Sequence, residues 1–575
     1  MGVCAKRSQR RGKENIRSLM IQTGIEEIYK LVRSNKFEQA EKLTLTHLKK
    51  NLDDSEYNFI YGIILVQKKD FLNALKHFKT SADKENSNYD SNYNCGNCLQ
   101  ILLRFEEAIE YYLRCISDSN NRYEPYLQIG RCYKQVKDYE KSIINLKKAN
   151  EINNNVENLI VLGNVYREIG NFTEAKKQFE TCLSLEKDNK IAYLSLINIE
   201  IDEGKLNRAQ KKLLGFLKDT EINKKNIELA KLQLGNVYKS IGDFGNAIKI
   251  NKEILNKNSD NYDAAYNLSI CYLFTKSFKE AWVFHEKRFY SSGFALLKQN
   301  HNNISKSQWD PTRPKKNVLF WGEQGLGEQI LYSQFIELIK DEFDNITLAL
   351  NEKLIPFFKK IYPNLNYIDY KRISKFNDYD FHIPMGSLGL YFQKYVKKES
   401  FQNIKEYNEI ENLPKKTEKI RCGISWKSTN KLTKHKKSID LKKLDKIFNI
   451  EGIEFVNLQY TNEKNEIADI ESSLKRKIFI DHGVDCFNDI DGVASLINTC
   501  DFIISVSNTN VHIAGKLGKK VLLLLPYSDG KLWYWGLNDD KEIIWYPSIH
   551  PIRQKKENDW DSCLLSLEKE IEKFL

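Results

Sequence analysis

The residues best placed to do chemistry lie in a glycine-rich junction over residues 317–336. There the apolar run Val318–Trp321 is followed by Gly322, Gly325 and Gly327. Apolar residues then recur with the spacing of one helix face, at Ile330, Leu331, Phe335 and Ile336. Glycines at such a junction let a ligand approach the backbone, and the unpaired N–H groups of the first helical turn attract anions. The stretch therefore predicts a strand, a tight ligand-binding loop and a helix.

A second junction of this kind follows the apolar run Phe502–Val506. The start of the helix predicted there can receive an anion on its backbone N–H groups, helped by the side chains of Asn508, Thr509 and Asn510. His512 falls in the first turns of the same helix, where the helix dipole disfavours an imidazolium. We therefore expect a neutral His512 that donates a hydrogen bond to a ligand, and a histidine packed in the core is the alternative.

The length and the net charge of the chain limit the class of protein to which it can belong. With 575 residues the chain is too long for one compact core, so at least two domains are expected. The net charge of +12 comes from 89 basic and 77 acidic residues spread along the chain. Such dilute positive charge suits phosphorylated or acidic ligands and does not indicate nucleic acid.

The cysteine content and the hydropathy of the sequence indicate the cellular compartment of the protein. No segment has the roughly 18 uninterrupted apolar residues of a membrane span. The eleven cysteines are scattered, most of them in helical patterns, which favours free packed thiols in a reducing compartment. The CxxC of Cys95 and Cys98 falls within such a pattern and is expected to pack. We expect a cytoplasmic protein, and the basic N-terminal segment leaves peripheral association with the inner face of the membrane as an alternative.

A small residue, an aromatic residue three positions later and a second small residue recur along residues 26–288. Clear copies begin at Gly130, Gly163 and Gly235. The period is about 34 residues, and the pattern resembles the tetratricopeptide repeat, in about eight units. Small residues are expected where two helices cross closely, so this part predicts an all-α superhelix with a concave groove.

Four units carry Asn directly after the first small position, at Asn97, Asn164, Asn198 and Asn236. In the repeat family this position lines the groove, where an amide can bind the backbone of an extended peptide. The alternative is that Asn is simply common at this position. We therefore expect the groove to bind a protein or another large partner.

From residue 317 onward apolar strand patterns alternate with helical ones, in two series separated by a polar break at residues 397–419. Two successive series of this kind predict two doubly wound lobes that face a cleft. The strand candidates are 318–321, 346–350, 367–368 and 381–383, and then 422–426, 455–459, 478–480, 502–506 and 521–525.

The predicted fold class is α plus α/β, an all-α repeat superhelix followed by two Rossmann-like lobes. The expected parts are a basic N-terminal segment (1–25), the repeat solenoid (26–290), a polar linker with Pro311 and Pro314 (291–316), a first lobe (317–415) and a second lobe (416–575).

Six motifs in the second half occur in the order of a known family. They are Trp321-Gly-Glu-Gln-Gly-Leu-Gly-Glu328, Gly423-Ile-Ser-Trp-Lys427, Lys437-Ser-Ile439, Phe455-Val-Asn-Leu-Gln459, Ile504-Ser-Val-Ser-Asn-Thr-Asn-Val-His-Ile-Ala-Gly515 and Trp545-Tyr-Pro547. Together they resemble bacterial proteins that fuse tetratricopeptide repeats to a heptosyltransferase-like (glycosyltransferase family 9 type) domain. The resemblance implies a GT-B fold, a nucleotide-sugar donor held mainly by the second lobe, and inverting transfer with no metal and no further cofactor. The O-linked N-acetylglucosamine transferases share the arrangement but not these motifs.

The resemblance implies that Glu328 is the catalytic base, because it stands where the heptosyltransferase pattern has Asp. Inverting transfer needs a base for the acceptor hydroxyl, and a carboxylate at a helix N-terminus stays ionised at neutral pH. The alternative is an acidic residue that only complements the helix dipole. Gln324, Gly325 and Gly327 would form a cleft loop where donor and acceptor approach each other closely.

The resemblance also implies a set of donor-binding residues. Lys437 matches a basic position that neutralises the donor diphosphate, although it ends a lysine-rich segment that also reads as a solvated basic loop. Ser507 departs from the family, which usually has Asp there. The full predicted donor set is Ser425, Trp426, Lys427, Lys437, Gln459, Ser507, Asn508, Thr509, Asn510 and His512.

Two DxD triplets, Asp378-Tyr-Asp380 and Asp489-Ile-Asp491, are not expected to bind metal, because a GT-B site needs none. The leading hypothesis is a glycosyltransferase that moves a sugar from a nucleotide sugar to a protein or glycan acceptor recruited by the repeats. The alternative is a repeat adaptor with a degenerate transferase domain, for which Glu328 and Ser507 are the motivating departures. An oxidoreductase is disfavoured because no GxGxxG follows a strand.

Overall fold

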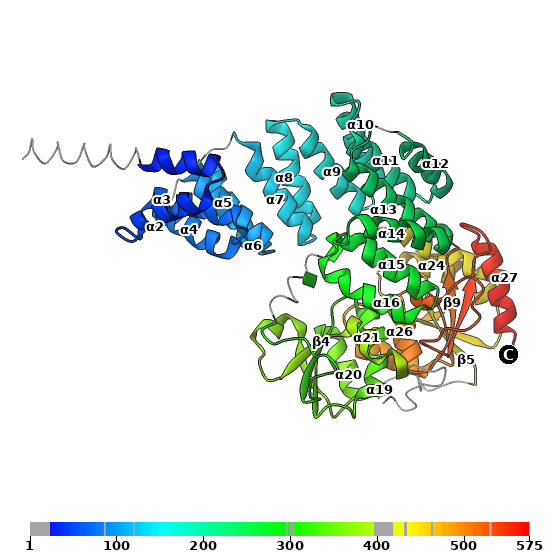
Figure 1. The fold of residues 1–575 in the computed structure, drawn as a ribbon. Helices are drawn as coiled ribbons and strands as arrows, with labels where there is room; N and C mark the ends of the chain where they lie inside the picture. Colours follow the sequence, from blue (N-terminus) through cyan, green and yellow to red (C-terminus); the bar gives the residue numbers. More distant parts are fainter. Residues whose placement is uncertain are drawn as a thin grey trace, which may run out of the picture. The chain divides into compact units, whose positions relative to one another are not determined.

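The computed structural model describes residues 24–573 except 85–87, 119–120, 220, 295–296, 299–300, 302–303, 396–406, 408–417, 430–433, 462–463, 475–476 and 528–531. The N-terminal segment predicted as basic and flexible lies almost wholly outside the described residues. The chain divides between Tyr193 and Leu194 into two compact units. Figure 1 shows the helices and strands of both, coloured along the sequence.

The first unit is a run of helix pairs. A helix at 24–33 is followed by α2 (Phe37–Leu48), α3 (Ser55–Gln67), α4 (Phe71–Lys84), α5 (Tyr89–Ile101), α6 (Phe105–Asp118), α7 (Tyr123–Gln135), α8 (Tyr139–Ile152), α9 (Val156–Glu168), α10 (Phe172–Leu185) and the first residues of α11 (Lys190–Asp202). Several helices begin with a side-chain cap, such as Asp54 accepting from the Tyr57 N–H and Asn88 accepting from the Ser91 N–H.

Close helix crossing explains the small residues of the repeat pattern. A Cβ added at Gly62 would lie 2.6 Å from the Phe78 ring, and one added at Gly96 would lie 2.5 Å from the Tyr112 ring. Such distances leave no room for any side chain. The predicted helical repeats are therefore confirmed, and for the physical reason that the sequence suggested.

The second unit begins with the remaining repeat helices and continues into the two α/β lobes. Its repeat helices are the main part of α11, then α12 (Leu206–Phe216), α13 (Lys224–Ile241), α14 (Phe244–Lys257), α15 (Tyr262–Phe274) and α16 (Phe278–His285). The short 3-10 turn η1 (Glu286–Tyr290) follows α16 directly.

The first lobe is built on a four-stranded parallel sheet with the order β3-β2-β1-β4. Its strands are β1 (Asn317–Trp321), β2 (Asn345–Leu350), β3 (Asn366–Asp369) and β4 (Phe381–Pro384). The helices are α18 (Leu326–Tyr332), α19 (Gln334–Ile339), α20 (Ile355–Ile361) and α21 (Leu388–Phe392). Figure 1 labels α19, α20 and α21 in the same lobe as β4.

The described part of the predicted linker packs against this lobe instead of bridging through solvent. Leu297, Ile304 and Trp309 are buried. The Trp309 N–H donates to the His382 carbonyl on β4 at 2.9 Å. Buried apolar side chains interrupt the polar composition that suggested a linker, so residues 304–309 behave as an extension of the sheet edge.

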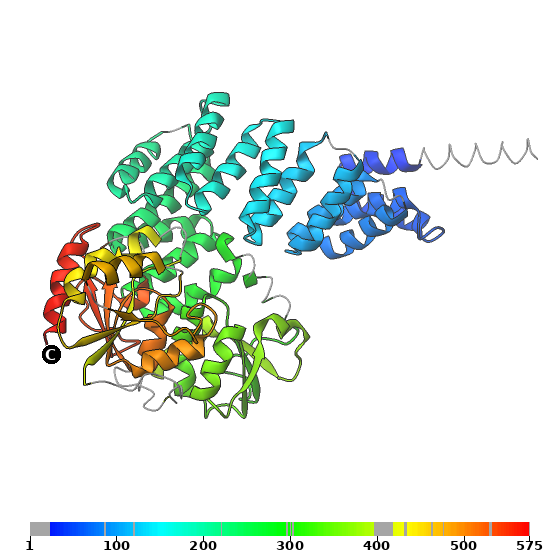
Figure 2. The ribbon, with the colours of Figure 1, turned by 180° about the vertical axis from the view of Figure 1, so that it is seen from behind.

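The second lobe has a six-stranded parallel sheet with the order β10-β9-β8-β5-β6-β7, seen from behind in Figure 2. Its strands are β5 (Ile420–Ser425), β6 (Ile453–Asn457), β7 (Ile478–Phe479), β8 (Phe502–Val506), β9 (Lys520–Leu525) and β10 (Ile549–Arg553). Its helices are α22 (Lys434–Lys437), α23 (Asp445–Phe448), α24 (Lys464–Leu474), α25 (Ile490–Thr499), α26 (Thr509–Lys516) and α27 (Trp560–Ile571).

All nine predicted strands are present, and the strand order of the second lobe is that of doubly wound nucleotide-binding sheets. The sequence missed β10, because Pro551 interrupts its apolar pattern. Proline is tolerated there because β10 is an edge strand. The confirmed class is therefore an all-α repeat region followed by parallel α/β lobes.

One hydrophobic core joins the last repeat to both lobes. Trp282 of α16, Phe335 of α19 and Tyr546 of the second lobe belong to the same buried cluster. The opposite face of the second sheet has a separate core with Trp426, Phe448 and Trp560. Among the described helices, none combines the length and the low charge needed to span a membrane.

Candidate functional site

The strand order of the second sheet reverses between β5 and β8, where doubly wound sheets bind ligands beyond the carboxyl ends of the strands. Two predicted donor residues meet at this point. The Asn508 side-chain amide donates to Ser425 Oγ at 2.8 Å, and its oxygen accepts from the Asn510 N–H at 3.1 Å, so Asn508 also caps α26.

Gln459 fixes the loop after β5. Its side-chain oxygen accepts hydrogen bonds from the backbone N–H of Trp426 at 3.0 Å and of Lys427 at 2.9 Å. The Lys427 ammonium forms an ion pair with Glu466, which also accepts from the Trp426 indole. Gln459 and Lys427 therefore hold the shape of the loop, and their polar groups are already engaged.

Some side chains around the start of α26 are already hydrogen-bonded within the protein, and others are accessible to a ligand. Asn510 is buried and donates to the Leu458 carbonyl at 2.6 Å, and Ser507 Oγ accepts from the Trp535 indole N–H at 2.9 Å. Thr509 is half-exposed at the first helical position. The backbone N–H groups of this turn, with Thr509, are the groups that best suit the predicted anion.

Glu328 lies in the first turn of α18, and its carboxylate folds back over Gly325. It accepts a hydrogen bond from the Tyr534 hydroxyl at 3.4 Å. Burial raises the pKa of Glu328, against the lowering influence of its own backbone N–H and of Lys437. From the helix N-terminus alone the sequence predicted a carboxylate that stays ionised at neutral pH, and the structure adds an upward influence on its pKa through desolvation by the second lobe.

Lys437 ends α22 and is only 5% exposed. No hydrogen bond or ion pair within 4 Å to its ammonium is found in the described part of the chain. Burial lowers the pKa of Lys437, and the nearby Glu328 carboxylate opposes this change. The side chain is therefore a packed cation whose charge is directed at the Glu328 region, and not one of a solvated basic loop. Residues 430–433 of that segment lie outside the described residues.

His512 brings the second lobe against the glycine-rich loop of the first. A Cβ added at Gly327 would lie 2.9 Å from His512 Nε2, which explains the glycine there. His512 Nδ1 lies 3.0 Å from the Tyr546 hydroxyl, and the ring packs among Tyr534, Trp535 and Tyr546. Burial and the Lys437 charge lower the pKa of His512 to about 3, which agrees with the neutral imidazole expected from the sequence.

The buried neutral His512 predicts loss of stability in acid. The unfolded chain binds a proton near the ordinary pKa of 6.5, whereas the folded chain binds it only near pH 3. Stability is therefore complete above pH 6.5 and is lost as the pH falls toward 3, by up to about 4 kcal/mol. Urea unfolding followed by tryptophan fluorescence reports on the second unit, because all eight tryptophans lie there. The His512→Gln variant should show a weaker dependence on pH between 7 and 4, and an equal dependence in both proteins would contradict the assignment.

The aromatic surroundings of the site were not predicted as functional residues. Tyr534 and Trp535 come from the 3-10 turn η8 (Trp533–Trp535) after β9, and Tyr546 from the Trp545-Tyr-Pro547 motif. Three adjacent aromatic residues beyond a strand end are the signal that could have identified them. A buried ion pair between Arg288 and Glu323 was also missed, because its partners lie far apart in sequence.

A cavity of about 510 Å³ lies beyond the carboxyl ends of β6 and β7. Its lining includes Gln459, Tyr460 and Thr461 after β6, and Asp481 and His482 after β7. This volume is in the range of small-molecule sites. The cavity is next to the switch point, since Gln459 contributes to both.

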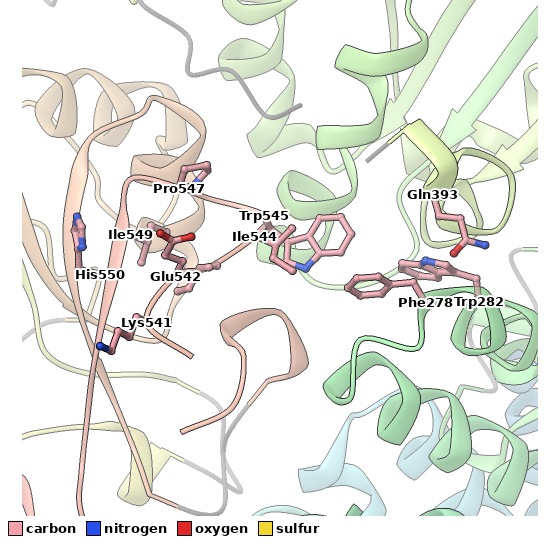
Figure 3. Close-up of a pocket in the computed structure, with 11 residues that line it drawn as sticks. Phe278, Trp282, Gln393, Lys541, Glu542, Ile544, Trp545, Pro547, Ile549 and His550 are labelled. Atoms are coloured by element: carbon pink, nitrogen blue, oxygen red, sulfur yellow. The ribbon is translucent and has the colours of Figure 1, made fainter. Parts of the chain in front are cut away.

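A more apolar cavity of about 490 Å³ lies elsewhere, between α16 and the segment before β10. Figure 3 shows Phe278, Trp282 and Gln393 on one side and Trp545, Pro547 and Ile549 on the other. None of the predicted donor residues and neither Glu328 nor Gly327 lines it. This cavity is thus separate from the predicted chemistry.

The predicted groove asparagines lie on the first helices of their repeats, two in each compact unit. All four are half-buried. Asn97 accepts from the Tyr112 hydroxyl at 2.8 Å, and Asn236 accepts from Lys239 at 3.1 Å. Asn164 and Asn198 lie at the equivalent positions of α9 and α11.

The acidic triplets and the cysteines have structural roles. Asp489 caps α25 through the Gly492 N–H, Asp491 pairs with Lys360 at 2.8 Å, and Asp380 accepts from the Asn317 N–H at 3.2 Å. The ten described cysteines form no disulfide with one another, and all but Cys486 are buried, as expected for packed thiols. No group of three or more His, Cys, Asp or Glu residues suited to a metal ion occurs in the described chain.

Comparison with known families identifies the class of the repeat region. The Tetratricopeptide repeat family matches residues 89–117, 123–156 and 156–189, so this part of the chain contains tetratricopeptide repeats. A solved tetratricopeptide repeat protein from Parabacteroides merdae is 16% identical, with a TM-score of 0.39, and the match covers 44% of this chain and 98% of that one.

Two curated proteins are similar over part of the chain. Protein FlbA of Caulobacter vibrioides is 23% identical over 311 residues, which is 50% of this chain and 51% of that protein. The BBSome complex member BBS4 homolog of Drosophila melanogaster is 22% identical over 256 residues, which is 42% of this chain and 52% of that protein. The chain thus spans about half the length of the curated relatives that it matches.

Proposed function

We propose that the two lobes form an inverting, metal-independent glycosyltransferase whose repeats recruit a protein or glycan acceptor. The observation that carries this proposal is the meeting of Glu328 from the first lobe with Lys437 and His512 from the second. The Lys437 charge acts on both other groups, and His512 packs on the loop that precedes Glu328. A carboxylate with a raised pKa can serve as the base of sugar transfer, a buried cation can stabilise the leaving diphosphate, and a neutral imidazole can donate a hydrogen bond to a substrate.

The proposed donor site follows the second sheet. The nucleoside occupies the cavity beyond β6 and β7, and the diphosphate extends along the switch point toward the N–H groups of α26 and Thr509. The sugar then reaches the junction of the lobes, where Lys437 is placed to stabilise the departing diphosphate. Ser425, Gln459 and Asn508 act by holding the loops of this site in place.

In the proposed reaction Glu328 removes the proton from an acceptor hydroxyl as its oxygen attacks the anomeric carbon. The bond from that carbon to the phosphate oxygen breaks, and the nucleoside diphosphate leaves with the bonding electrons. Because Glu328 has a raised pKa, it is a stronger base than an exposed carboxylate. Activity is expected to fall as acid protonates Glu328, at a pH above the ordinary carboxyl range.

The tetratricopeptide repeats favour a protein partner, since such repeats present an extended concave surface. The proposal therefore assigns the partners as a nucleotide sugar and a large acceptor, with no nucleic acid. The amides of Asn97, Asn164, Asn198 and Asn236 are candidates for contacts with an acceptor backbone.

A repeat adaptor without transferase activity is the second candidate. It is favoured by Ser507, which stands where the resembled family has Asp and which bonds to Trp535. The ion pair between Lys427 and Glu466 also favours it, because Glu466 already neutralises a lysine that was predicted to bind the donor.

Calorimetric titration with UDP, GDP, ADP and CMP sugars distinguishes the two candidates. The transferase is expected to bind one nucleotide class with a dissociation constant between about 1 μM and 1 mM. The variant Asn510→Ala should weaken this binding, because it frees the start of α26 from Leu458. No binding of any of these donors at millimolar concentration would reject the enzyme and leave the adaptor.

A further inference from the structure

A charged side chain from the end of the repeat region fills the switch point of the first sheet. The strand order reverses there between β1 and β4, and ligands of open α/β sheets bind beyond the carboxyl ends of such strands. In this chain the place holds the guanidinium of Arg288, from η1 directly after the last repeat helix. Arg288 therefore lies where a ligand would bind in an open sheet of this kind.

The contacts of Arg288 are complete and buried. Nε and Nη2 donate to the two carboxylate oxygens of Glu323 at 2.5 Å and 2.7 Å, and both side chains are fully buried. Nη2 also donates to Ser387 Oγ at 2.9 Å, and Glu323 accepts from the Gly386 N–H at 2.6 Å. Nη1 donates to the His285 carbonyl at 3.1 Å and to Glu286 Oε1 at 2.9 Å. A two-pronged pair of this kind fixes direction as well as distance.

The ion pair fixes one end of the segment that carries Glu328. Glu323 lies in the glycine-rich loop, five residues before Glu328. The other end is fixed by Gln329, which donates to the Gln324 carbonyl at 2.9 Å and accepts from the Asn351 N–H at 3.1 Å. Glu328 is thus held between two anchors, one of which belongs to the repeat region.

A buried ion pair is a weak source of stability, because both charges must lose their hydration. Packed apolar side chains would fill the same crevice at lower cost. The retention of Arg288 and Glu323 therefore calls for a role in specifying geometry. Within the described site, that geometry fixes the loop over Gly322–Gly327.

We propose that Arg288 is a positioning residue, which clamps Glu323 and thereby sets the place of Glu328 opposite the second lobe. The end of the repeat region is then a part of the transferase site and not only a tether for the acceptor. This inference rests on the proposed transferase function.

The test compares the full-length chain with Arg288→Met. If the clamp positions Glu328, kcat should fall by about 100-fold, as expected for a small displacement of a catalytic group, while the calorimetric affinity for the nucleotide sugar stays unchanged. The acidic limb of the rate profile should also move to lower pH, because a loosened Glu328 becomes hydrated and its pKa falls toward the ordinary carboxyl value. A merely structural arginine would not move that limb.

Two further variants keep the test decisive. Arg313→Met removes an arginine whose pair with Asp310 is partly exposed, and it should change neither kcat nor the pH profile. If Arg288→Met fails to fold, Ser387→Ala removes one contact of the clamp and leaves the ion pair, and it should shift kcat and the acidic limb in the same direction by less. A folded Arg288→Met or Ser387→Ala protein with unchanged kcat and pH profile overturns the proposal.

Amide hydrogen exchange separates this inference from the proposed function. In Arg288→Met, exchange over residues 322–328 should become faster, while exchange over β8 and α26 stays as in the unmodified chain. If no nucleotide sugar binds the unmodified protein, the transferase proposal fails, and faster loop exchange would still support the clamp. Unchanged exchange over residues 322–328 would overturn the clamp whatever the outcome of the donor titration.

Discussion

Glu328→Gln is expected to reduce the rate of sugar transfer by about 10²- to 10⁴-fold, the usual contribution of a general base. The amide keeps the size of the side chain and can still contact the Tyr534 hydroxyl, so the loop should keep its shape. The affinity for the nucleotide sugar should stay unchanged, because the proposed donor-binding groups belong to the second lobe. Initial rates with a transferable donor, together with calorimetry, measure both quantities.

A matched control for this variant is Glu352→Gln in the same lobe. Glu352 is 58% exposed and pairs with Lys371 at the surface, so its loss should leave both quantities unchanged. Full transfer activity in Glu328→Gln would remove the base assignment. It would leave Glu328 as an acidic residue that only complements the start of α18.

Lys437→Met is expected to lower the transfer rate by about 10²- to 10³-fold, because it removes the cation that we propose stabilises the departing diphosphate. It should also weaken the binding of nucleoside diphosphates. The loss cannot be ascribed to unfolding if the melting temperature is unchanged or higher, and replacing a buried cation by an apolar side chain favours that result.

The pH profile of the residual activity in Lys437→Met gives an independent check. The Lys437 charge lowers the pKa of Glu328, so its removal should raise that pKa. The base is then protonated at a higher pH, and the acidic limb of the rate profile should move upward. Lys442→Met is the control, since Lys442 is 65% exposed and should leave the limb in place. An unmoved limb in Lys437→Met would contradict the proximity of the two groups.

The repeats and strands could be predicted from sequence because each depends on a local pattern. The glycines at 62 and 96 report close helix crossings, and the apolar runs of β1 and β8 are complete within a few residues. β10 was missed because Pro551 breaks its pattern, and its stability comes from pairing with β9. Local sequence patterns therefore predict the helices and most strands, but not the edge strand β10.

The site was only partly predictable for a different reason. The family resemblance identified Glu328 and Lys437 as candidates, and a predicted helix start identified His512. The direction of the Glu328 pKa shift, however, depends on burial by a lobe that follows about 200 residues later. The engagement of Lys427 with Glu466 and of Asn510 with Leu458 likewise depends on packing between elements. The roles of these residues in transfer stay predictions.

The core shared by the last repeat and the two lobes has a consequence for how this architecture can be rearranged. Trp282 of α16 is buried against Gly389 of the first lobe and faces Trp533 of the second, with ring centres 5.9 Å apart. Cutting the chain after the repeats would expose this indole and its apolar neighbours on both fragments. The two lobes therefore cannot be transferred to another repeat array as an independently folding domain. A chimera that gains a new acceptor specificity has to inherit α15, α16 and η1 together with the lobes, and to be spliced further toward the N-terminus.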